Sequence, residues 1–135
     1  MRLIDVYDEY ELATVVLFQL LRERTPEESI SHKAMPTFEQ HCAFVASRPY
    51  LAWYLAEADG YVRGAVYLSK QREIGAAIHK AQRGHGYGLD AVGELMRLHP
   101  GRFLANIAPG NDASLALFRK LGFGGPIQVT LERAA

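Results

Sequence analysis

Cysteine is nearly absent from this chain of 135 residues, in which Cys42 is the single example. One cysteine excludes a disulfide framework within the chain. The five histidines have no cysteine partners at the spacing of a zinc finger. We therefore expect neither a disulfide scaffold nor a metal site.

An excess of either charge is also absent, since 15 basic residues balance 15 acidic ones. That balance argues against a general nucleic-acid-binding protein. The longest apolar run, residues 13–18, is far too short to span a bilayer. Acidic residues interrupt the N-terminus before the apolar run of a secretion signal could form. We expect a cytoplasmic protein that binds neither nucleic acid nor a membrane.

What the sequence does contain is typical of one globular domain. Hydrophobic residues make up 49% and charged residues 22%, and a chain of this length can bury a core without staples. No repeat or linker divides it, so we treat residues 1–135 as a single domain. Residues 1–40 carry eight acidic and four basic side chains, whereas residues 61–135 carry five and ten. This is either a chance pattern of solvated charge or a sign of a cationic ligand near the first half and an anionic one near the second.

The first half predicts one strand and three helices. Apolar residues recur at helical spacing between Asp8 and Arg24. A hydroxyl, a proline and two glutamates at residues 25–28 predict the start of a short helix. Thr37 and Gln40 form the capping box of another helix, which ends near Arg48. With an opening strand at residues 2–6, this half is mainly helical.

The second half predicts strands that alternate with helices. Asp59-Gly60 is a strong hairpin signal between strands at residues 50–58 and 61–69. Further segments follow the hairpin: a strand at 73–79, a helix from 88 to 99, a strand at 102–107, a helix from 111 to 121 and a strand at 128–132. This order predicts an α/β or α+β fold with a sheet of mixed direction.

The most informative segment is rich in glycine and follows the strand at 73–79. Gly84, Gly86 and Gly88 alternate with His85 and Tyr87, directly before a helix. Small residues at this point let an anion approach the backbone, and the free N–H groups of the first helical turn then point at it. The alternative is a tight turn with glycines for clearance. A phosphate-bearing ligand is the interpretation that we prefer.

Two nucleotide-binding motifs fail on their spacing. The Walker A pattern is absent. A dinucleotide fingerprint needs a third glycine three positions after Gly86, where Leu89 stands. It also needs an acidic residue about twenty positions later, where Asn106, Ile107 and Ala108 stand instead.

The loop resembles the acyl-coenzyme A loop of the GNAT superfamily of N-acetyltransferases. Arg83-x-x-Gly86-x-Gly88 is similar to that family's R/Q-x-x-G-x-G/A signature. Residues 111–123 are similar to its N-x-x-S-x-x-L-[YF]-x-K-x-G-F helix. The resemblance is specific over residues 73–123 and only architectural over residues 1–70.

The resemblance implies a fold and a cofactor. The fold is α/β (α+β), with a mixed, mostly antiparallel central sheet of about six strands flanked by helices and splayed between the fourth and fifth strands. The cofactor is acetyl-coenzyme A, whose acyl-pantetheine arm inserts at that splay. Its implied binding residues are Ala76, Ala77, Ile78, Arg83, Gly84, His85, Gly86, Tyr87, Gly88, Asn111, Ser114 and Phe118.

The resemblance also implies direct attack by a primary amine in a ternary complex. The backbone N–H of Ile78 would polarise the thioester carbonyl, and Glu73 would act as general base through water. The alternative for Glu73 is an exposed carboxylate at the end of a strand, and His79 could also reach the acyl end. The family often has a tyrosine as general acid where this sequence has Phe118. Tyr67, together with Tyr54 and Tyr87, is a candidate for that role. No covalent nucleophile is needed, so Cys42 is expected in the core.

The acceptor is not named by any motif. The resemblance implies a small-molecule or peptide amine, and it leaves room for a homodimer. One or two of Trp53, Tyr54, Tyr61 and Tyr67 are proposed to line the acceptor site, with His32, His41 and Phe38 as weaker candidates and Glu27 and Glu28 as acidic ones. Because Phe118 cannot donate a proton, a non-catalytic acyl-CoA-binding module is the alternative.

Overall fold

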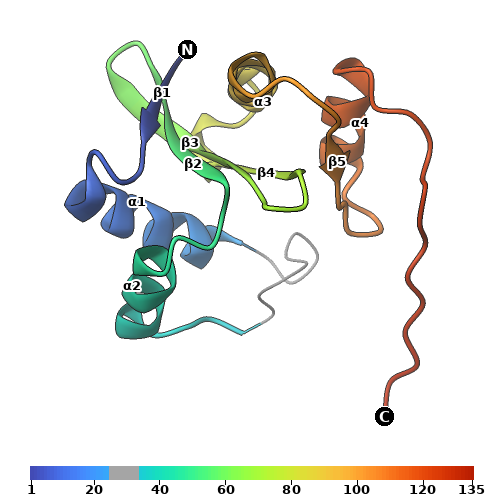
Figure 1. Ribbon diagram of the computed structural model, residues 1–135, viewed down its shortest axis with the longest axis horizontal. Helices are drawn as coiled ribbons and strands as arrows, with labels where there is room; N and C mark the ends of the chain where they lie inside the picture. The colour runs from blue at the N-terminus through green and yellow to red at the C-terminus, as the bar shows by residue number, and fades with distance from the viewer. Residues whose placement is uncertain (25–33) are drawn as a thin grey trace.

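The computed structural model describes residues 1–24 and 34–135 (Figure 1). The short helix predicted at residues 25–28 therefore lies outside the described residues. The elements in chain order are β1 (Arg2–Asp5), α1 (Tyr10–Glu23), α2 (Phe38–Ala46), β2 (Ala52–Ala58), β3 (Tyr61–Leu68), β4 (Glu73–Ile78), the 3₁₀ turn η1 (Lys80–Gln82), α3 (Tyr87–Leu98), β5 (Leu104–Ala105) and α4 (Asp112–Lys120).

The strands form one sheet in the order β1-β2-β3-β4-β5. The first three pairs are antiparallel and β4 pairs with β5 in parallel, so the predicted mixed, mostly antiparallel sheet is confirmed. Asp59 and Gly60, which join β2 to β3, both have positive φ values, of 54° and 82°. Two positive values in a two-residue loop suit the right-handed twist of the hairpin strands, as the sequence signal predicted.

Helices cover both faces of this sheet. Helices α1 and α2 lie on one face and α3 on the other, while α4 lies beside β5 (Figure 1). Successive residues of β3 face opposite helix layers, because side chains of a strand alternate between its two faces. Ala65 belongs to the core cluster under α1 and α2, and Val66 belongs to the cluster under α3 and α4.

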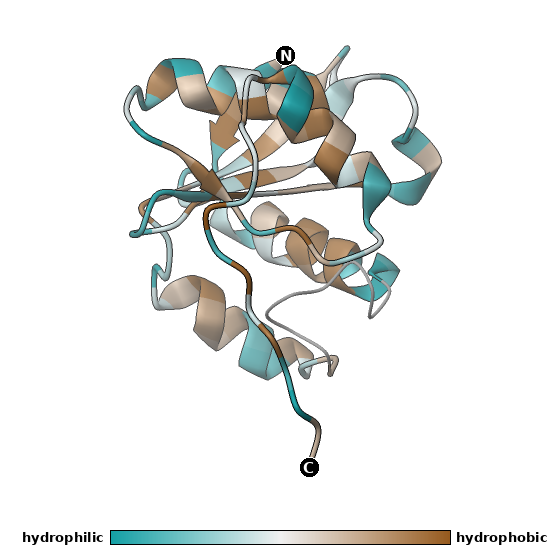
Figure 2. Cartoon of the chain, turned by 90° about the vertical axis from the view of Figure 1, so that its right-hand side faces the viewer, coloured by the Kyte–Doolittle hydropathy of each residue, from teal (hydrophilic) through white to brown (hydrophobic). Residues whose placement is uncertain are grey.

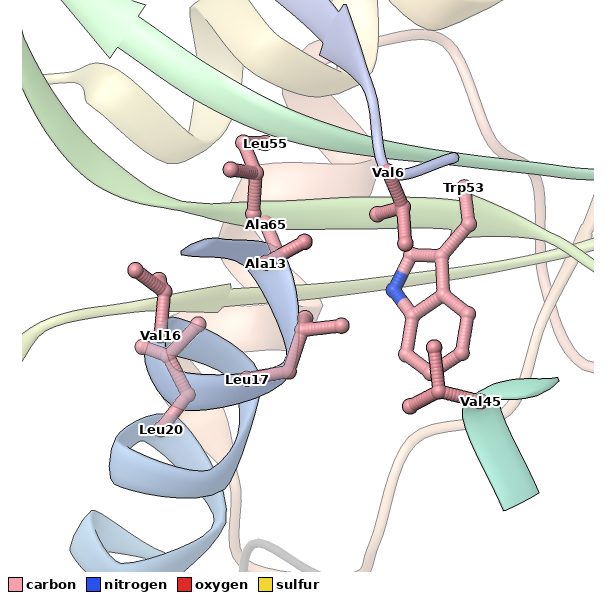
Figure 3. Close-up of a cluster of buried hydrophobic side chains, with 9 residues drawn as sticks. All are labelled: Val6, Ala13, Val16, Leu17, Leu20, Val45, Trp53, Leu55 and Ala65. Carbon is pink, nitrogen blue, oxygen red and sulfur yellow. The ribbon is translucent and has the colours of Figure 1, made fainter. Parts of the chain in front are cut away.

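Each face of the sheet buries its own apolar cluster. On the α1 side, Leu17, Leu20 and Val45 pack with Trp53 and Leu55, and all five are at most 8% exposed (Figure 3). The cluster on the other face is formed by Ala56, Val66, Leu68, Ile74, Ala91, Val92, Leu95 and Phe118. Both clusters reach β4, so the strand that borders the candidate site is anchored from both sides.

The sheet opens between β4 and β5. Their pairing is restricted to Glu73 with Leu104 and Ile74 with Ala105. In the described part of the chain, residues 75–78 of β4 have no strand on that side. This is the predicted splay between the fourth and fifth strands.

The prediction of a strand at residues 128–132 is wrong. Residues 124–135 lead away from the fold and pair with no strand (Figures 1 and 2). Ile127, Val129 and Leu131 are 73%, 74% and 90% exposed. The strand predicted at 102–107 is only two residues long, Leu104–Ala105. The segment at residues 128–132 therefore has a very short edge strand with which to pair. The described sheet thus has five strands rather than about six.

The described residues contain no helix that is long and apolar enough to cross a membrane. Within the same residues, no group of three or more His, Cys, Asp or Glu side chains could hold a metal ion. Cys42 is partly buried in α2.

Candidate active site

The opening beside β4 forms a hollow of about 890 Å³, which we call the splay hollow. Its walls are β4, the start of α3, residues 106–108 and α4. Of the predicted catalytic and coenzyme-binding residues, His85, which is exposed, is the one that does not line it. The predicted residues that do line it are Tyr67, Glu73, Ala76, Ala77, Ile78, Arg83, Gly84, Gly86, Tyr87, Gly88, Asn111, Ser114 and Phe118.

The glycine loop gives the splay hollow an anion-binding end. Gly84 and Gly86 have φ values of 86° and 79°, in the left-handed region that side chains disfavour. A Cβ at either residue would meet no atom within 4 Å, so the space beside the loop is open. Gly86 is the N-cap of α3 and supplies no side-chain cap. The first N–H groups of α3 therefore point toward open space, which suits a phosphate group.

Two arginines hold the loop against the sheet. The Nε of Arg83 donates to the carbonyl of Ile78 at 3.2 Å, which joins the loop to the end of β4. The guanidinium of Arg63 lies 4.9 Å from the ring centre of Tyr87 and hydrogen-bonds to Gln82. Both contacts place positive charge beside the glycine loop.

The edge of β4 offers backbone groups to the splay hollow. The N–H of His79 donates to the carbonyl of Arg63 on β3, at 2.9 Å. Because N–H groups alternate in direction along a strand, those of Ile78 and Ala76 point away from β3, toward the hollow. The small side chains of Ala76 and Ala77 leave this edge accessible. The N–H of Ile78 is therefore available for the role that the resemblance implied, which stays a prediction.

Glu73 lies at the start of β4, at the floor of the splay hollow. Its carboxylate accepts from the Ser69 hydroxyl at 3.3 Å and from the side-chain amide of Asn106. Ser69 also accepts the backbone N–H of Glu73 at 2.9 Å. The carboxylate is thus fixed in position between β4 and the chain that follows β5.

Tyr67 lies on β3, on the face of the sheet that α1 and α2 cover. It is the cross-strand partner of Gly75, and a Cβ on Gly75 would clash with the Tyr67 ring and hydroxyl. The ring stacks on Tyr50 with centres 3.9 Å apart and planes 6° from parallel. Glycine at position 75 is therefore required for this tyrosine to lie flat across β4.

Burial raises the pKa of both hydroxyls in this stack, and the nearby guanidinium of Arg24 acts in the opposite direction. The two hydroxyls also interact through a hydrogen bond with each other. Both groups remain protonated at neutral pH.

A second hollow of about 420 Å³, which we call the apolar pocket, lies between α1, α2 and the sheet. Its lining includes Trp53 and His41, two of the proposed acceptor-site residues. The ring of His41 is held by the Thr14 carbonyl, 3.0 Å from Nε2. The apolar pocket and the splay hollow share a wall formed by Leu20, Arg24, Tyr50, Tyr67, Gly75, Ala76 and Ala77.

Several proposed residues lie elsewhere. The Tyr54 hydroxyl is 2.6 Å from His99 Nε2 at the end of α3, and His79 pairs with Glu23 at 3.1 Å. Tyr61 is 68% exposed. None of these, nor Phe38, lines either hollow. The remaining three, Glu27, Glu28 and His32, lie outside the described residues.

Helix α4 forms the far wall of the splay hollow. The Asn111 side chain caps it by accepting the N–H of Ser114 at 3.2 Å. Phe118 is 6% exposed and packs edge-on against Phe123, with ring centres 5.0 Å apart. Phe118 therefore combines a place in the wall with a place in the core.

Sequence reasoning missed Arg24, Tyr50 and Asn106. Arg24 and Tyr50 border elements that carry no motif, and they meet only in the folded chain. A glycine inside a strand does indicate the close approach of another group, and Gly75 opposite Tyr67 was such a signal.

Comparison with known proteins gives a consistent family and fold. The model of the acetyltransferase (GNAT) family matches residues 14–123, which include the loop and helix motifs. No curated protein sequence matches the chain.

Three solved structures illustrate the likeness of fold. yncA from Salmonella typhimurium, solved with its cofactor acetyl-CoA, is 22% identical over 90% of this chain and 77% of its own, with a TM-score of 0.65. A phosphinothricin acetyltransferase from Sinorhizobium meliloti in complex with AcCoA is 22% identical over 90% of this chain and 73% of its own, with a TM-score of 0.67. Mutant forms of the spermidine/spermine N-acetyltransferase SpeG from Vibrio cholerae are 16% identical over 91% of this chain and 77% of their own, with a TM-score of 0.66.

Proposed function

The chain belongs to the acetyltransferase (GNAT) family, and we propose that it transfers an acetyl group from acetyl-CoA to a primary amine in a ternary complex. One observation carries this proposal: the splay hollow and the apolar pocket meet at a shared wall that contains Tyr67, Ala76 and Ala77. An acyl donor in one hollow and an amine in the other would approach each other across the edge of β4, which favours direct attack.

The residues of the splay hollow fit acetyl-CoA, which supplies an activated acetyl thioester. The open, positive-φ loop at Gly84 and Gly86 suits the pyrophosphate. Ala76, Ala77 and Ile78 present a free strand edge for the pantetheine arm. Asn111, Ser114 and Phe118 form the opposite wall. The N–H of Ile78 would stabilise the negative charge that develops on the carbonyl oxygen.

Tyr67 is our proposed general acid. Of the three tyrosines considered, Tyr54 is bonded to His99 on the other face and Tyr87 lies at the glycine loop. Tyr67 lines both hollows and keeps its proton at neutral pH. It would replace the proton donor that Phe118 cannot be, by donating to the departing thiolate.

Glu73 remains the proposed general base. It lines the splay hollow together with Tyr67, and its charge adds to burial in raising the pKa of that tyrosine. Ser69 and Asn106 fix its carboxylate, which would accept a proton from the amine through water. The cytoplasmic location and the homodimer also remain predictions.

Two measurements test the activity. Calorimetry with acetyl-CoA should show binding, and thiol release should follow when amines of different classes are added. Absence of binding would contradict the whole proposal. Binding without turnover on amino acids, amino sugars, polyamines or peptides would instead support the non-catalytic module, the alternative that Phe118 suggests.

A further inference from the structure

We propose that the acceptor is a small amine with an apolar or aromatic body and an acidic group, and that Arg24 binds the acidic group. This inference rests on the proposed acetyl transfer and adds the chemical class of the acceptor. It places the body of the acceptor in the apolar pocket and its amine at the shared wall with the splay hollow.

The walls of the apolar pocket select the body. Trp53 and Phe44 meet edge-to-face, with ring centres 6.1 Å apart, and Tyr50 meets Trp53 in the same way at 4.7 Å. Leu17 and Leu20 of α1 complete the apolar lining. A volume of about 420 Å³ is in the range of small-molecule sites. Such walls favour a single aromatic or branched aliphatic group over a long polar chain.

Arg24 gives the apolar pocket its charge. Among the described lining residues it is the only lysine, arginine, aspartate or glutamate. No carboxylate in residues 1–24 or 34–135 forms an ion pair with it. A guanidinium beside an apolar cavity has a strong preference for a carboxylate or phosphate, which it can bind through two parallel hydrogen bonds.

The stacked tyrosines strengthen the same preference. The positive charge of Arg24 lowers the pKa of both Tyr50 and Tyr67 against the effect of their burial, so the guanidinium acts on the same region as the two hydroxyls. A cation placed there would be repelled, whereas an anion would be attracted. The acidic group therefore belongs near Arg24, and the amine belongs farther along the shared wall, at Ala76 and Ala77.

This conclusion reverses one expectation from the sequence. The acidic excess of residues 1–40 suggested a cationic acceptor held by carboxylates. In the described part of the apolar pocket the charge has the opposite sign, and Glu27 and Glu28 are outside the described residues. Spermidine, a cationic amine without an acidic group, therefore serves as the probe of the opposite expectation.

The decisive experiment compares amines that differ only in the acidic group. Thiol release from acetyl-CoA is measured with L-phenylalanine and 2-phenylethylamine, with L-leucine and 3-methylbutylamine, and with spermidine. We expect kcat/KM to be on the order of tenfold higher for each carboxylated partner, because the charge-assisted pair with Arg24 is lost in the other. Equal rates, or a preference for spermidine, would contradict the inference while leaving the proposed acetyl transfer intact.

The variant Arg24→Gln assigns the effect to one side chain. KM for L-phenylalanine should rise about tenfold and KM for 2-phenylethylamine should stay constant, which removes the preference. The matched control is Arg22→Gln, since Arg22 is exposed on the same helix and lines neither hollow. Equal preference in wild type and Arg24→Gln would refute the role of Arg24.

Binding can be measured without turnover. Trp53 is the only tryptophan of the chain and lies in the wall of the apolar pocket, so its fluorescence reports occupancy directly. Titration with 3-phenylpropionate, which has no amine, should quench or shift the emission in wild type and do so much less in Arg24→Gln. If no amine is acetylated and this titration still succeeds, the catalytic proposal fails and the acidic-ligand site stands. If the titration fails as well, both are wrong.

Discussion

The two hollows that meet at β4 present different kinds of groups to a ligand. The splay hollow presents backbone groups, namely the N–H groups at the start of α3 and at Ile78, next to glycines with positive φ. The apolar pocket presents side chains, with stacked rings and one guanidinium. Recognition by backbone requires glycine at fixed positions, whereas recognition by side chains leaves the order and spacing of residues free.

This difference explains why only one of the sites has a sequence motif. Arg83, Gly86 and Gly88 lie within six consecutive positions because a single turn of chain forms the glycine loop. The lining of the apolar pocket comes from α1, α2 and three strands, so Arg24 and Tyr67 are neighbours only after folding. A short motif therefore marks the splay hollow, which we propose to hold the coenzyme. The apolar pocket, which we propose to hold the acceptor, is found only in the folded structure.

The largest expected effect comes from a substitution that disrupts the splay hollow alone. Gly86→Val places a β-branched side chain at a φ of 79°, in the space beside the first turn of α3. The strain is roughly 1–2 kcal/mol, and the side chain would occupy the volume of the pyrophosphate. We expect affinity for acetyl-CoA, measured by calorimetry, to fall by more than about 100-fold.

Gly60→Val is the matched control for this strain. Gly60 has a φ of 82° and an equally open environment, but it lies in the β2–β3 hairpin and lines neither hollow. Its substitution should lower the melting temperature and leave the dissociation constant of acetyl-CoA unchanged. Equal losses of affinity in both variants would show that general strain, rather than the loop, controls binding.

The next largest effect concerns the wall that the two sites share. Tyr67→Phe removes the proposed proton donor, so kcat should fall by about 100-fold with little change in acetyl-CoA affinity. Tyr54→Phe is the control, because that hydroxyl lies on the other face beside His99. If Tyr87→Phe shows the large loss and Tyr67→Phe does not, the general acid is Tyr87.

A smaller effect is expected at the base of the splay hollow. Glu73→Gln keeps the shape of the side chain and an oxygen for Asn106, but it removes the proton acceptor. We expect kcat to fall by about tenfold or more while the dissociation constant of acetyl-CoA stays constant. Glu94→Gln, at a carboxylate of α3 that pairs with Arg97 and lines neither hollow, should leave kcat unchanged. An unchanged kcat in Glu73→Gln would reduce this carboxylate to a structural role.

The same contrast between local and distant residues separates the parts of the fold that the sequence predicted from those that it did not. Helix α2 followed from the capping box of Thr37 and Gln40, which the structure contains, and the β2–β3 hairpin followed from Asp59-Gly60. The alternation at Ile127, Val129 and Leu131 was misleading, because a strand also needs a partner and β5 is only two residues long. Local chemistry identifies caps and turns, whereas pairing depends on what lies across the sheet.

Gly75→Ala should affect both hollows modestly. The new methyl group would clash with the Tyr67 ring, so the stack on Tyr50 must shift at a loss of roughly 1–3 kcal/mol of unfolding free energy. A several-fold loss of kcat should accompany it. In a Tyr67→Ala background the same substitution should have almost no further effect, since the clash is gone. Gly125→Ala, in open space, is the control, and additive losses would show that the two residues do not interact.

The smallest expected effect is a pH dependence of the free energy of unfolding that arises in the apolar pocket. Burial is the largest cause of the raised pKa of Tyr50 and of Tyr67. The folded protein therefore retains these protons at a pH where the unfolded chain, with tyrosine pKa values of about 10, has lost them. These two tyrosines therefore make their full contribution to the free energy of unfolding at a pH below about 10. That contribution is lost as the pH rises from there toward the raised pKa values of the folded protein. Denaturant unfolding should show a smaller alkaline loss in Tyr50→Phe than in wild type, whereas Tyr61→Phe, at a 68% exposed residue, should behave like wild type. An equal alkaline loss in all three would place the titrating groups outside the apolar pocket.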